Sequence, residues 1–119
     1  MNGLQLLLRA EQVALFVAGV VAYLALGGNW LLALPLLLVF DLSMVGYLAG
    51  PRAGAITYNL GHNLVVAAAV AGIGWWTGIG WVQLLAALWV AHIGMDRSLG
   101  FGLKLPSDFR DTHLGRIGR

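Results

Sequence analysis

The sequence predicts an all-α, polytopic membrane protein: four transmembrane helices in an antiparallel bundle, followed by a C-terminal tail at the membrane interface. Three observations predict this class. Only 10% of the 119 residues are charged, against roughly 25% in a typical soluble domain. The mean hydropathy is +0.83, which leaves too little polar surface to cover a water-soluble globule. Four apolar segments also approach the ~20 residues that cross a bilayer.

The four predicted helices cover about residues 4–26, 31–50, 54–74 and 80–99. Short, glycine-containing turns separate them, and connections this short make sequential helices antiparallel neighbours. Pro51 follows Gly50 and favours the start of the third helix. The more polar tail covers residues 100–119. We therefore expect residues 1–119 to form a single transmembrane domain.

The basic residues predict the orientation. All seven lie on the side of the N-terminus, the second turn and the tail: Arg9, Arg52, Arg97, Lys104, Arg110, Arg116 and Arg119. The positive-inside rule therefore predicts that both termini are cytoplasmic. Tryptophans dominate the opposite end and match an interfacial aromatic belt. Because the net charge is only +2 and no basic run occurs, we expect no nucleic-acid partner.

Four ionisable residues lie at a similar predicted depth, one in each helix: Glu11, Asp41, His62 and His92. At 1.5 Å per residue this layer lies roughly 10–13 Å below the cytoplasmic boundary. A central aspartate costs about 2.5–3.5 kcal/mol to insert, so such groups face the interior, pair or line a wet cavity. The layer is therefore either a functional site or a hydrogen-bonded knot that fixes helix packing.

Metal binding is one use of this layer. His92 and Asp96 stand four residues apart on one helix face, and His62 lies at the same predicted depth. Without any cysteine, His and Asp ligands suit Zn²⁺, Mn²⁺ or Fe²⁺. Asp41 is a fourth ligand or a general base, and Glu11 is a second candidate for proton exchange. A haem held by both histidines is a lower-ranked alternative, because it leaves the carboxylates without a role.

Other polar residues are candidates for substrate binding or catalysis. Asn59 and Asn63 continue the polar face of His62. Hydrophobic residues interleave with charged ones in the tail, which suits an interfacial lid over the bundle mouth. From such a lid, Asp111 and His113 would reach the layer. The predicted substrate-binding residues are Asn59, Asn63, Arg97 and Lys104.

Several stretches together resemble a known family: DLSMVGYLAGPR (41–52), YNLGH (58–62), AHIGMDR (91–97), GFGLK (100–104) and DTHLGR (111–116). They are similar to the small bacterial membrane proteins catalogued as domain of unknown function 4260, over nearly the whole chain. The resemblance implies a four-helix protein of the bacterial inner membrane. It implies no activity.

A weaker, local resemblance concerns His92, Asp96 and the following Gly100 and Pro106. They are similar to a helix-end motif of inner-membrane metal-dependent hydrolases. Those proteins have an earlier His-Arg-Gly-x-x-His element, where this chain has only NLGHN at residues 59–63. This departure weakens the case for hydrolysis.

Three functions follow from these patterns. The first is a metal-dependent membrane enzyme acting on a lipid-like or amphipathic substrate. The second is a small proton-coupled transporter that works as an oligomer. The third is an accessory or assembly subunit of a larger membrane complex. We favour the enzyme, with the lipid bilayer as its surroundings.

Overall fold

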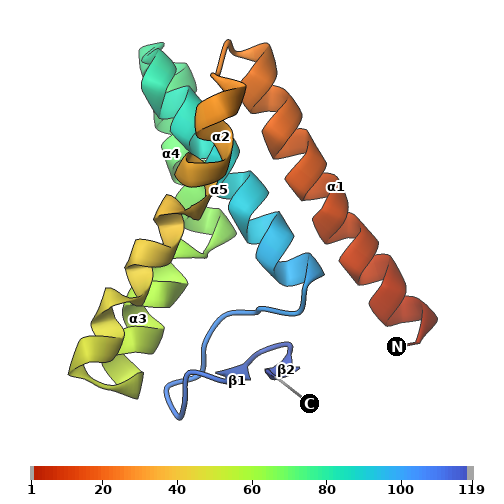
Figure 1. Ribbon diagram of the computed structural model, residues 1–119, viewed down its shortest axis with the longest axis vertical. Helices are drawn as coiled ribbons and strands as arrows, with labels where there is room; N and C mark the ends of the chain where they lie inside the picture. The colour runs from red at the N-terminus through yellow and green to blue at the C-terminus, as the bar shows by residue number, and fades with distance from the viewer. Residues whose placement is uncertain (1, 118–119) are drawn as a thin grey trace.

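The computed structural model describes residues 2–117 and is predominantly helical (Figure 1). The prediction of an all-α chain is confirmed at this level. The elements in chain order are α1 (Gly3–Ala25), α2 (Trp30–Leu37), the 3-10 helix η1 (Leu38–Ala49), α3 (Pro51–Gly61), α4 (Leu64–Thr77), α5 (Gly80–Ser98), β1 (Asp111–Thr112) and β2 (Gly115–Arg116).

Helix α1 is bounded and packed by local sequence signals. Asn2 and Gln5 form a capping box at its start, with each side chain bonded to the other residue's backbone. At its contact with α5, the two helices approach closely at Gly19 and Gly94. A Cβ added at Gly19 would lie 2.6 Å from the Ala87 carbonyl oxygen. Glycine therefore sets the separation of these helices.

The second predicted helix differs from expectation in its second half. Residues 30–49 are continuously helical, but the α-helical part ends at Leu37 and η1 continues as a 3-10 helix. In a 3-10 helix, residues three apart share a face. Phe40, Ser43 and Gly46 follow this spacing and lie against α3, where Ser43 meets Gly61 and Gly46 meets Thr57. The tighter helix thus aligns one row of residues with α3.

The third predicted helix is broken rather than continuous. Helix α3 ends at Gly61, and α4 begins at Leu64. His62 and Asn63 between them have non-helical backbone angles. The Asn63 side chain accepts a hydrogen bond from the Val65 amide and caps α4. A continuous helix over residues 54–74 was therefore the wrong prediction, because Asn63 starts a new helix.

Helix α5 is the central element. It contacts α1, α2, α4 and η1, and in Figure 1 it lies behind α2 between α4 and α1. Three helical segments are long and apolar enough to cross a membrane, Gly3–Ala25, Trp30–Ala49 and Pro51–Thr77, which is consistent with a membrane protein. Helix α5 is not among them. The buried face of α5 is mostly apolar and small, but it also contains the fully buried His92.

The tail occupies the end of the molecule where α1 begins (Figure 1). There it passes between the α3/η1 pair and the first turns of α1. The hairpin of β1 and β2 pairs Asp111 with Arg116, and an isolated bridge joins Lys104 to Thr112. Asn59 of α3 anchors the tail through two hydrogen bonds with the Lys104 backbone, of 2.6 and 2.9 Å. The tail is thus ordered against the helices.

Candidate metal centre

Four side chains from three elements converge at one point. Asp41 comes from η1, His62 from the break between α3 and α4, and His92 and Asp96 from successive turns of α5. The two Nε2 atoms lie 2.9 Å apart. The Asp41 Oδ1 atom lies 3.3 Å from His62 Nε2 and 3.2 Å from His92 Nε2. Asp96 Oδ2 lies 3.2 Å from each Nε2 atom.

These separations are close to, and slightly shorter than, the edges of a tetrahedral metal site. Zinc bonds to imidazole nitrogen and carboxylate oxygen are about 2.0–2.2 Å, so ligand atoms around a tetrahedral zinc are ~3.3–3.6 Å apart. The five nitrogen–nitrogen and nitrogen–oxygen separations are 2.9–3.3 Å, slightly shorter than this. One ligand atom from each of the four residues falls within 4.8 Å of the others. The cluster therefore has a geometry that could hold a metal ion.

The backbone fixes how the two imidazoles face the cluster. His62 Nδ1 lies 3.0 Å from the Tyr58 carbonyl oxygen, and His92 Nδ1 lies 2.7 Å from that of Leu37. Carbonyl oxygens only accept hydrogen bonds, so both Nδ1 atoms carry the proton. In the neutral rings, both Nε2 lone pairs then point at each other and at two carboxylates. Four acceptors this close need a cation between them, either a metal ion or a proton.

The end of α3 and the break before α4 supply carbonyls around His62. The last carbonyls of a helix have no intrahelical partner and need others when buried. Tyr58 O accepts from His62 Nδ1, and Gly61 O accepts from Trp89 Nε1 at 2.6 Å. Arg97 Nη2 lies 3.4 Å from His62 O. The Tyr58 ring also stacks on the His62 ring, with centroids 3.7 Å apart.

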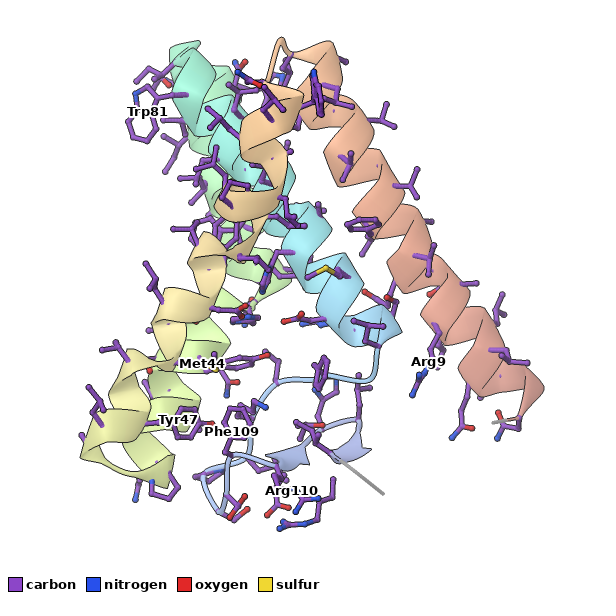
Figure 2. The ribbon with its side chains drawn as sticks, viewed as in Figure 1. Arg9, Met44, Tyr47, Trp81, Phe109 and Arg110 are labelled. Atoms are coloured by element: carbon purple, nitrogen blue, oxygen red, sulfur yellow. The ribbon has the colours of Figure 1, made fainter. Side chains whose placement is uncertain are left out.

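A cavity of about 180 Å³ reaches the cluster from the tail side, with Asp41 and Asp96 in its wall. The Asp41 side chain is 38% exposed, whereas that of His92 is fully buried. Lys104 also lines this cavity, and its Nζ lies 3.9 Å from the centroid of the Phe109 ring. Figure 2 shows Phe109 beside Tyr47 and near Met44 of η1. Burial lowers the pKa of Lys104, while the Asp96 carboxylate opposes this shift.

Of the five residues predicted to share the layer or to bind a metal, the structure brings four together and leaves one apart. Asp41, His62, His92 and Asp96 meet, but Glu11 is exposed on α1 and is not in the cluster. The predicted convergence of Glu11 with the other ionisable residues of the layer was therefore wrong. Depth along a helix does not determine rotation about its axis, and α1 turns its Gln12 and Phe16 positions toward Gly94. Glu11 consequently faces elsewhere.

The remaining predicted site residues have contacts outside the cluster. Asn59 binds the Lys104 backbone, and Asn63 caps α4. Asp111 accepts from Ser107 and pairs with Arg116 within the tail. His113 Nδ1 accepts from the Leu103 amide at 2.8 Å. Arg97 lies behind His62 at the end of α5, so only Lys104 shares a cavity with the cluster.

Sequence reasoning missed three residues that support His62. These are Tyr58, which stacks on its ring, Ser43, whose Oγ lies 3.2 Å from Nδ1, and Trp89, which binds the preceding carbonyl. The position of Tyr58 four residues before His62 is a signal that could have identified it, since such positions are neighbours on a helix. Nothing in the spacing of Trp89 points to Gly61.

The sequence model of the family described as Domain of unknown function (DUF4260) matches residues 5–117. The protein belongs to the DUF4260 family. The resemblance seen in the sequence motifs is thereby confirmed. No curated protein and no solved structure matched the chain. For this DUF4260 member, the argument for function therefore depends on the geometry of the cluster.

Proposed function

We propose that this DUF4260 protein is a bacterial inner-membrane metalloenzyme that acts on a lipid-like or amphipathic substrate by a hydrolase-like reaction. The observation that carries the proposal is the convergence of two imidazole nitrogens and two carboxylates, with both Nδ1 atoms committed to backbone carbonyls. Both histidines are buried, the Asp96 side chain is 13% exposed, and Asp41 is the most exposed of the four cluster residues but still partly buried. Such preorganisation favours ion binding.

Zinc is the ion that this ligand set fits best among Zn²⁺, Mn²⁺ and Fe²⁺. Two imidazoles and two carboxylates at tetrahedral separations are within its usual ligand choice, whereas Mn²⁺ favours more oxygen ligands. With His62, His92 and Asp96 as its protein ligands and Asp41 left to exchange a proton, a bound divalent ion would have an open position at which to supply Lewis acidity to a substrate oxygen. The residues around the cavity would hold the substrate and exchange its proton.

The cavity beside Asp41 supports an enzyme rather than a closed structural site. Asp41 is the partly exposed member of the cluster and faces this cavity, so it is the group best placed to exchange a proton. Lys104 is 4% exposed and lines the same cavity, where its ammonium would hold an anionic part of the substrate. Aromatic rings complete the apolar wall.

The membrane arrangement proposed here has four spans and cytoplasmic termini. Helix α5 would be the fourth span, enclosed by the three apolar ones, and therefore needs little lipid-facing surface. The first turns of α1 and the tail share one end of the molecule, and Figure 2 places Arg9 and Arg110 there and Trp81 at the other end. This separation supports the positive-inside orientation.

Metal analysis of the purified protein tests the proposal. After purification in zinc-supplemented medium without chelator, we expect about one equivalent of zinc per chain, and loss of most of it in His92→Ala and Asp96→Asn. His113→Ala removes a histidine outside the cluster and should keep the metal. Size-exclusion profiles and circular dichroism report whether each variant folds. Folded wild-type protein without metal would overturn the metal-dependent function.

A transporter is the second candidate, favoured by the irregular spans. Both the α2/η1 change and the α3/α4 break occur beside the cluster. Discontinuous helices at a central site are common in transporters. Metal uptake into proteoliposomes, driven by a pH gradient and lost in Asp41→Asn, would favour transport. Metal retention without uptake would favour the enzyme.

A further inference from the structure

A second and larger cavity, of about 380 Å³, lies apart from the cluster at the end of the molecule near the tail. Helix α1 contributes Gln5, Leu8, Arg9 and Gln12 to its wall. The end of α5 contributes Arg97, and the tail contributes His113 and Leu114. Figure 2 shows Arg9 on the side of α1 that faces the tail. The cavity is therefore built from three separate parts of the chain.

Two guanidinium groups line this cavity without a carboxylate partner. Arg9 Nη1 and Arg97 Nη2 each make a long contact of 3.4 Å to a backbone carbonyl, of Ser98 and His62 respectively. Among residues 2–117, no aspartate or glutamate lies within ion-pair distance of either arginine. Each guanidinium has five donors, so most of this capacity is available. Such a pair favours a phosphate group.

The other polar groups add a donor and an acceptor. His113 Nδ1 accepts from the Leu103 amide, which leaves the proton of the neutral ring on Nε2. The Gln12 Oε1 atom is buried and has no hydrogen-bond partner within residues 2–117. A buried carbonyl oxygen without a donor is costly. A ligand hydroxyl would satisfy it.

The apolar part of the wall indicates an amphiphile. Leu8 and Leu114 line the cavity beside the cationic groups. Leu4 and Leu7 nearby on α1 are 65% and 59% exposed, which suits contact with acyl chains in a membrane. Hydrogen-bond donors for a phosphate, placed next to an exposed apolar helix face, are typical of a site at the boundary between lipid headgroups and hydrocarbon.

We propose that this cavity binds a phosphate-bearing, hydroxylated amphiphile, with the phosphate between Arg9 and Arg97. The Nε2–H of His113 donates a further hydrogen bond to the phosphate, and a ligand hydroxyl donates to Gln12. The acyl chains lie along the leucines of α1. The same phosphate chemistry would accept a free inorganic phosphate, and the experiment distinguishes the two sources. This inference does not depend on the metal centre or on catalysis.

Binding measurements on the metal-replete protein in neutral detergent test this proposal. The probes are dihexanoyl phosphatidylglycerol, dihexanoylglycerol with the same chains but no phosphate, and inorganic phosphate. We expect the phospholipid to bind at least about tenfold more tightly than dihexanoylglycerol, a difference of ~1.4 kcal/mol. Arg9→Gln should remove most of this difference. Arg52→Gln, at the start of α3 and outside the cavity, should not.

The binding results distinguish a phospholipid site from a free-phosphate site. Saturable binding of inorganic phosphate that Arg9→Gln abolishes would assign the site to free phosphate and keep the cation pair as its basis. Equal binding of the phospholipid and dihexanoylglycerol, or equal losses in Arg9→Gln and Arg52→Gln, would overturn the proposal. Arg9 is exposed, so its variant should fold, and a size-exclusion profile and a circular dichroism spectrum like those of the wild type confirm this independently.

Discussion

At the scale of single residues, the arrangement of His62 and His92 depends on backbone carbonyls that irregular helices make available. The His62 ring bonds to Tyr58 O at the end of α3, and the His92 ring bonds to Leu37 O where α2 gives way to η1. Each contact places the proton on Nδ1 and the lone pair on Nε2. The helix irregularities therefore determine the chemistry of the imidazoles.

Trp89 offers a test of this support. Trp89→Phe keeps an aromatic ring, which stacks on Phe40 at 5.0 Å, but removes the donor to the Gly61 carbonyl. Leaving that carbonyl unpaired should lower the free energy of unfolding by about 1–3 kcal/mol and weaken metal binding. Denaturant titration in mixed micelles and metal titration measure the two effects. Unchanged values in both would show that the Gly61 contact is unimportant.

His113 gives the tail a dependence on pH. Burial, and then the positive charge of Arg97, lower the pKa of His113 from its ordinary 6.5. Below the ordinary value, a released tail binds more protons than a docked one, so docking weakens as the pH falls. It is unaffected well above pH 6.5, where both forms are neutral.

Hydrogen exchange measures this effect. We expect amides of the tail, including that of His113 bonded to Leu103 O, to lose protection between pH 7.5 and pH 5.5 after correction for intrinsic rates. His113→Gln should abolish the dependence. A tail whose protection is constant over this range would contradict the assignment.

At the scale of elements, the positions of the helices were predictable, but their interruptions were not. A long apolar stretch located α1 closely, and the glycine-containing turn before residue 80 and the polar tail after residue 99 located α5. Hydropathy could not show the Asn63 cap, which is a local hydrogen bond with the Val65 amide, or the 3-10 geometry of η1, which accompanies its packing against α3. The hairpin in the tail was also missed, because its strands are only two residues long.

Glycine spacing between α1 and α5 provides a prediction for a pair of elements. A Cβ added at Gly94 would lie 2.7 Å from the Gln12 carbonyl oxygen and from the Phe16 amide nitrogen, and both are backbone atoms that cannot rotate away. Gly94→Ala should therefore force the helices apart and cost about 1–3 kcal/mol.

Gly72 on α4 is the matched control, because an added Cβ there has no atom within 4 Å. Gly72→Ala should be neutral or slightly stabilising, since alanine favours a helix over glycine by about 1 kcal/mol. Both variants are compared by unfolding in mixed micelles. Equal stability of the two would mean that α1 and α5 do not pack as closely as described.

At the scale of the whole molecule, the central helix, which carries two of the four cluster residues, packs among four other helical elements. Helix α5 carries His92 and Asp96 and contacts α1, α2, α4 and η1. The sequence predicted that Asp41, His62 and His92 lie at one depth, and these three do meet. It could not exclude Glu11, because the depth of a residue along α1 does not determine which way its side chain faces around the helix axis. The sequence also predicted that Asp96 lies beside His92, because the two residues are four apart on one helix.

The central claim is that one metal ion is bound in the cluster formed by residues of η1, the α3/α4 break and α5. Extended X-ray absorption fine structure spectroscopy on zinc-loaded protein tests this claim most directly. The account predicts two imidazole ligands plus oxygen ligands at about 2.0–2.2 Å, and one imidazole fewer in either His62→Ala or His92→Ala. A bound zinc without imidazole scattering, or a spectrum unchanged in both variants, would contradict it.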